Sequence, residues 1–90
     1  MRSVEIYVSG RVQGVGYRYF VVSKANMYKI KGYTKNMYDG RVKIIACGDK
    51  LNLDLFIQEL RKGPTFARVK NLEISDLTAS THYDNFRVEF

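Results

Sequence analysis

Three glycines fall within seven residues in the run Gly-Arg-Val-Gln-Gly-Val-Gly-Tyr-Arg, residues 10–18, between a strand-like and a helix-like segment. Glycine tolerates positive φ and lets backbone amides come close to a ligand. Where such a loop enters a helix, unpaired N–H groups and the positive end of the helix dipole converge. Arg18 adds a planar guanidinium that matches phosphate with two parallel hydrogen bonds. These residues predict a phosphate-binding cradle at the start of a helix.

The segments around this loop show two clear periodicities. Val4, Ile6 and Val8 alternate with other residues, which is typical of a strand with one buried face. Apolar residues at helical spacing predict two helices, and Asp39-Gly40 is a strong hairpin signal. In chain order, we expect a strand at 3–9, a helix at 19–28, strands at 33–38 and 42–46, a helix between the N-cap Asp49 and Gly63-Pro64, a strand at 68–77, a polar turn at 78–85 and a closing strand at 86–90.

The order of these elements predicts the fold class. We summarise it as βαββαβ, an α+β ferredoxin-like sandwich in which two helices cover one face of a four-stranded antiparallel sheet. Ninety residues suffice for one small domain with its own core, so residues 1–90 are assigned to a single domain.

Composition limits the cellular setting and the partners. The lone Cys47 has no partner for an internal disulfide or a metal motif, which indicates a reducing compartment, and the cytoplasm is expected. No apolar run reaches membrane-spanning length, and charges near the start argue against a signal peptide. The net charge of +6 attracts anions, but the basic residues are dispersed, as on a solvated surface.

Two motifs resemble those of a known family. Residues 10–18 look like the signature of the acylphosphatases, and Gly-Tyr-Thr-Lys-Asn at 32–36, followed by Asp-Gly-Arg-Val at 39–42, resembles their second motif. The resemblance covers nearly all the chain. It implies a stand-alone hydrolase that cleaves the carboxyl–phosphate bond of acyl phosphates to a carboxylate and inorganic phosphate, with no metal and no other cofactor.

The resemblance also implies the roles of individual residues. Arg18 would bind and neutralise the phosphoryl group, and Asn36 would hold the attacking water in line; these two are the expected catalytic residues. The leaving carboxylate has a conjugate acid with a pKa near ~4, so no general acid is needed. The phosphate-binding residues, acting through their backbone amides and the Arg18 side chain, would be Gln13, Gly14, Val15, Gly16, Tyr17 and Arg18.

Two aromatic or charged residues differ from the pattern of this family. Tyr17 stands where Phe is commoner, and Lys29 where Gly is frequent; a left-handed backbone at Lys29 would cost about 1 kcal/mol.

The alternative function is a non-catalytic anion- or RNA-binding ferredoxin-like module, although Thr34 and Asn36 do not fit an RNA-recognition signature. We expect a monomer whose partners are a small acyl phosphate and inorganic phosphate, with no specific nucleic acid and no membrane.

Overall fold

The structure is a computed structural model that describes residues 1–78 and 82–90. Within these residues, five strands and two helices follow one another with short connections. The predicted turn at 78–85 includes residues 79–81, which lie outside the described residues. The elements are β1 (Arg2–Arg11), α1 (Tyr17–Met27), β2 (Lys31–Asn36), β3 (Val42–Gly48), α2 (Lys50–Lys62), β4 (Arg68–Asp76) and β5 (Phe86–Glu89).

The described strands form one sheet in the order β4-β1-β3-β2-β5. β1 is antiparallel to both β3 and β4, and β2 is antiparallel to β3. The short β5 pairs in parallel with β2 at one edge. The expectation of a four-stranded antiparallel sheet was therefore wrong in strand number and in the direction of the last pair. Alternation of side chains marks a strand, but it does not say which edge that strand joins.

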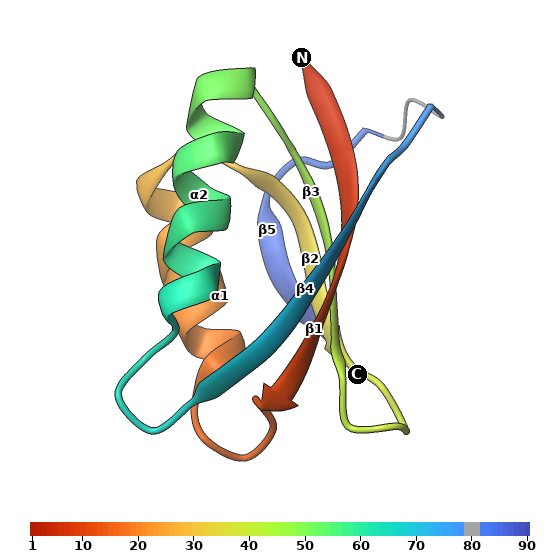
Figure 1. Cartoon of the computed structure of the whole chain (residues 1–90). Helices are drawn as coiled ribbons and strands as arrows, with labels where there is room; N and C mark the ends of the chain where they lie inside the picture. Colours follow the sequence, from red (N-terminus) through yellow and green to blue (C-terminus); the bar gives the residue numbers. More distant parts are fainter. Residues whose placement is uncertain (79–81) are drawn as a thin grey trace.

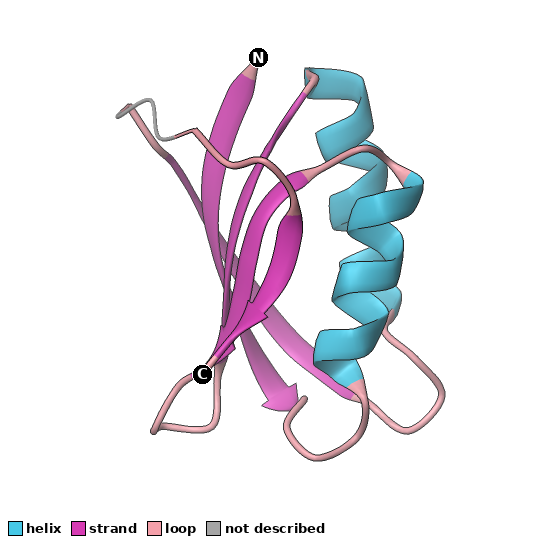
Figure 2. Cartoon of the chain, turned by 180° about the vertical axis from the view of Figure 1, so that it is seen from behind, coloured by secondary structure: helices cyan, strands magenta, loops and turns pink. Residues whose placement is uncertain are grey.

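Both helices lie on the same face of the sheet, as the two opposite views show (Figure 1, Figure 2). The alternating Val4, Ile6 and Val8 of β1 are all buried, and so are Val21 of α1 and Phe56 of α2. These side chains belong to one continuous core between the sheet and the helices. The α+β ferredoxin-like sandwich predicted from the sequence is thereby confirmed.

The element boundaries differ from the predicted ones by a few residues. α1 begins at Tyr17, two residues before the expected start, because the loop enters the helix directly after Gly16. Asp49 and Gly63 flank α2 as predicted, although the Asp49 side chain makes no capping hydrogen bond. Lys29 has a φ of 57°, so the left-handed backbone expected there is present. No helix among the described residues has the length and apolar character needed to cross a membrane.

The connections that matter for function meet at one end of the molecule. The loop from β1 to α1 and the hairpin from β2 to β3 both lie at the lower end in Figure 1, and the reverse view agrees. β1 and β2 both run toward this end, because each is antiparallel to β3. The sheet therefore brings the glycine loop and the last residue of β2 to the same end of the molecule.

Candidate active site

The loop between β1 and α1 leaves several backbone N–H groups without a protein acceptor. Gly14 and Gly16 have φ values of 73° and 79°, a left-handed conformation that glycine adopts at little cost. From Gln13 to Tyr19, no N–H donates to an oxygen of the described chain. A Cβ placed on either glycine would meet no atom within 4 Å, so this side of the loop is open. Free donors at a helix start suit an anion.

Arg18 lies in the first turn of α1, where the helix dipole makes a cation unfavourable. The first turn contains no acidic residue. Arg18 forms no ion pair with residues 1–78 or 82–90. Its guanidinium carbon lies 5.3 Å from the centre of the exposed Phe90 ring, which is within the range of a cation–π contact. No acid among the described residues therefore neutralises the charge of Arg18.

Gln13 connects the loop to the hairpin. Its Nε2 donates hydrogen bonds to the carbonyl oxygens of Met37, at 2.8 Å, and Arg41, at 2.9 Å. Met37 directly follows Asn36, so these bonds fix the glycine loop beside the end of β2. From its place in the motif, Gln13 is expected to act only through its backbone amide. The signal for this further role is a glutamine, with two amide donors, in a loop that otherwise lacks long polar side chains.

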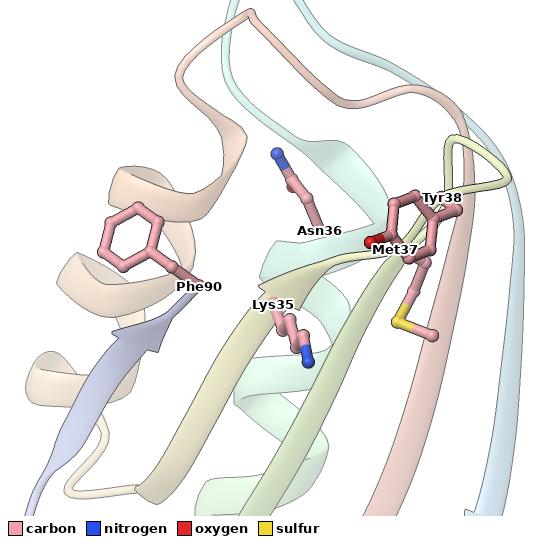
Figure 3. Close-up of a pocket in the computed structure, with 5 residues that line it drawn as sticks. All are labelled: Lys35, Asn36, Met37, Tyr38 and Phe90. Carbon is pink, nitrogen blue, oxygen red and sulfur yellow. The ribbon is translucent and has the colours of Figure 1, made fainter.

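Asn36 is the last residue of β2 and lines a pocket of about 390 Å³. Its side chain points toward the loop and the first turns of α1, whereas Lys35 points the opposite way (Figure 3). The Oδ1 atom is buried and accepts no hydrogen bond from the described residues. A buried amide oxygen without a donor is unfavourable. The other residues that line the pocket are Lys35, Met37, Tyr38 and Phe90.

The structure brings the two predicted halves of the site near each other by two routes. Gln13 bonds the loop to the hairpin beside Asn36. Phe90 contacts the Arg18 guanidinium and also lines the pocket with Asn36. Arg18 and the loop residues do not themselves line this pocket. Their convergence on one anion remains a prediction. Phe90, which sequence alternation assigned only to a strand, is an unexpected part of the lining of this pocket.

Tyr17 contributes its backbone to the loop and its side chain to the core. The ring is buried, and the hydroxyl donates a hydrogen bond of 2.9 Å to the carbonyl oxygen of Leu60. Burial raises the pKa of Tyr17 far above its ordinary value, so the phenol remains a proton donor. Of the groups on Tyr17, the N–H alone is therefore available to a ligand.

The acid nearest in sequence to Asn36 is engaged with its own hairpin. Asp39 accepts hydrogen bonds from the backbone N–H of Arg41, at 3.1 Å, and from its side-chain Nε, at 2.8 Å. The backbone bond is the main reason that the pKa of Asp39 lies below its ordinary value. Asp39 therefore stays ionised near neutral pH and is no proton donor there. In the part of the chain that the structure describes, no three His, Cys, Asp or Glu residues form a group that could hold a metal ion.

Comparison with known proteins gives consistent matches along the whole chain. The family model described as Acylphosphatase matches residues 4–88. An acylphosphatase of Archaeoglobus fulgidus is 46% identical over 90 residues, and one of Oceanobacillus iheyensis is 43% identical over 91 residues; each match covers all of both chains. The crystal structure of acylphosphatase from Bacillus subtilis matches with a TM-score of 0.97 and 36% identity, again over all of both chains.

Proposed function

Since the chain belongs to the acylphosphatase family, we propose that its glycine loop and Arg18 hold the phosphoryl group of an acyl phosphate while Asn36 positions the attacking water. The activity is hydrolysis of the carboxyl–phosphate bond to a carboxylate and inorganic phosphate. This places the chain among enzymes rather than among anion-binding or RNA-binding modules of similar fold. The roles of the individual residues are the part that we propose.

One observation carries the assignment of the phosphate site. The N–H groups from Gln13 to Tyr19 have no acceptor in the described chain, and Arg18 lies at the same helix start without an acidic partner. A phosphoryl group carries its negative charge on equatorial oxygens, so several N–H donors and one guanidinium can bind it simultaneously. Because these donors are already in place, they stabilise the transition-state charge without reorganisation.

Asn36 suits the role of holding water. An amide oxygen accepts a hydrogen bond from the water and leaves a lone pair on that water free to attack phosphorus. The Oδ1 of Asn36 has no protein donor to lose, and a half-turn about χ2, which is a broad torsion, exchanges it with Nδ2. A neutral amide also avoids the repulsion that a carboxylate would exert on the phosphoryl group.

The finer expectations on setting and assembly belong to the same proposal. We expect the protein to act as a monomer in the cytoplasm on a small-molecule acyl phosphate. The site as assigned is built within one chain, since Gln13, Arg18, Asn36 and Phe90 contact or adjoin one another without a second copy. Sedimentation of the protein at enzymatic concentrations tests the expected monomer, and a dimer would contradict it.

Turnover of benzoyl phosphate, followed by ultraviolet absorbance, tests the residue roles. Arg18→Ala should lose both phosphate binding and turnover, by at least about a hundredfold in kcat/KM, because charge-assisted hydrogen bonds contribute roughly 1.5 to 3 kcal/mol each. Asn36→Ala should lower kcat by about a hundredfold with little change in KM, because it displaces only the nucleophile. The exposed Arg61→Ala and Asn26→Ala are matched controls that should retain full activity.

Two results would contradict the proposal. If folded wild-type protein hydrolyses benzoyl phosphate no faster than buffer, the enzymatic assignment fails. If Asn36→Ala keeps its kcat within a factor of two of wild type, another group must position the water. Circular dichroism of each variant separates loss of function from loss of fold.

A further inference from the structure

A hollow of about 640 Å³ lies where the end of β1 meets the start of β4, and no role in catalysis has been given to the residues around it. The three cations of its wall form no ion pair and no side-chain hydrogen bond with residues 1–78 or 82–90. The next acid along β4, Glu73, lies opposite Tyr7 and is not part of the wall. The wall consists of Gly10, Arg11, Arg68 and Lys70.

The pairing of β1 with β4 places these three cationic residues on neighbouring backbone positions. Arg11 lies directly opposite Arg68 in the antiparallel ladder, and like charges in that position are destabilising. The register shifts at Ser9 and Gly10, whose partners are Asn71 and Val69, so Lys70 is left as an extra residue. A bulge of this kind re-aims side chains. The register thus places three exposed positive charges around one shallow, open hollow, and an anion bound there would reduce their mutual repulsion.

We propose that this hollow is a second anion site, separate from the glycine loop, and that it binds a compact polyanion of the diphosphate or triphosphate kind. Two guanidinium forks and one ammonium group can bind several phosphate oxygens at once. A single carboxylate would leave part of this charge unmatched. Arg11 precedes Gln13 by two residues, so the Cα atoms of these two residues are at most about 7 Å apart.

The test uses inorganic tripolyphosphate as the probe and Arg18→Ala as the background, so that binding at the glycine loop is weakened. Calorimetry gives the affinity, and ¹H–¹⁵N NMR locates the site. We expect one tripolyphosphate to bind and to shift the amides of Gly10, Arg11 and residues 68–70. Adding Arg68→Gln and Lys70→Gln should weaken binding about tenfold, since the two substitutions remove two solvent-exposed charge contacts, which are weaker than buried ones.

The matched control removes two cations elsewhere. Lys29→Gln with Lys31→Gln gives the same change in net charge on exposed residues that do not line the hollow, and it should leave the affinity within twofold. Equal weakening in both double variants, or NMR shifts that leave residues 68–70 unmoved, would overturn the proposal. In the protein with Arg18 intact, Arg68→Gln with Lys70→Gln should keep the wild-type kcat on benzoyl phosphate, because neither residue belongs to the catalytic site.

A second set of titrations identifies the source of the polyanion. If ATP and tripolyphosphate bind with equal affinity, the hollow recognises the phosphate chain alone. If ATP binds more tightly, the hollow also recognises the nucleoside. Both results support the proposal. Preference for a single-stranded oligonucleotide, with shifts that spread across the sheet, would overturn it, because binding would then follow the general positive charge of the surface.

Discussion

Replacing Tyr17 with phenylalanine should destabilise the protein without impairing catalysis. The Tyr17 hydroxyl donates to the carbonyl oxygen of Leu60 at 2.9 Å. Within α2 that carbonyl would pair with the N–H four residues later, but the residue there is Pro64, which has none. Leu60 is fully buried, so Tyr17→Phe leaves a buried carbonyl unsatisfied, at a cost of about 1–3 kcal/mol.

Thermal unfolding by circular dichroism provides the assay. For a domain of this size, each kcal/mol corresponds to roughly 4–8 °C in Tm, so the expected decrease is well above the error of the measurement. Tyr19→Phe is the matched control, because that side chain is 81% exposed and its loss of a hydroxyl should leave Tm unchanged. The backbone N–H of residue 17 persists in the variant, so kcat on benzoyl phosphate should stay at the wild-type value. A Tyr17→Phe protein as stable as Tyr19→Phe would refute this reasoning.

Three further predictions concern stability. Gln13→Ala loses two hydrogen bonds to hairpin carbonyls and should lower the free energy of unfolding by about 1–3 kcal/mol; in urea titrations, a loss no larger than for the exposed Gln58→Ala would contradict this. Lys29→Gly should raise that free energy by about 0.5–1 kcal/mol, because the left-handed backbone strains lysine by more than the extra entropy of glycine favours the unfolded chain. Lys29→Ala, which keeps a Cβ, should not raise the free energy of unfolding. Burial raises the pKa of Tyr17 in the folded protein. The contribution of the Tyr17 phenol to the free energy of unfolding is therefore complete below the pKa of an unfolded tyrosine, about 10, and decreases as pH rises above that value. If the free energy of unfolding falls with pH equally steeply above pH 10 in wild type and in Tyr17→Phe, this prediction is wrong.

The sequence predicted those parts of the fold that depend on local patterns. Alternation in Val4, Ile6 and Val8 placed the buried face of β1 correctly, and Asp39-Gly40 indicated the hairpin. The position of β5 could not be read in this way. Its parallel pairing with β2 depends on contacts between residues more than fifty positions apart, which leave no periodic signal in either strand.

The sequence predicts the candidate site as a list of residues, but it does not predict how these residues are arranged. Motif spacing singled out Arg18 and Asn36, and the structure places both near Phe90. The link from Gln13 to the hairpin and the contact of Phe90 with Arg18 were missed. Both contacts join segments that are far apart in the sequence. Only the packing of the elements shows that they meet.

The central claim is that the glycine loop, Arg18 and Asn36 form a single site for a phosphoryl group. A crystal structure of the protein soaked with inorganic phosphate tests it most directly. We predict one phosphate at the start of α1, with backbone nitrogens of residues 13–18 and the Arg18 guanidinium at hydrogen-bonding distance of about 2.7–3.1 Å, and with the Asn36 amide on the open side of the anion. A phosphate bound only in the hollow of Arg11, Arg68 and Lys70, with the glycine loop empty, would contradict the claim.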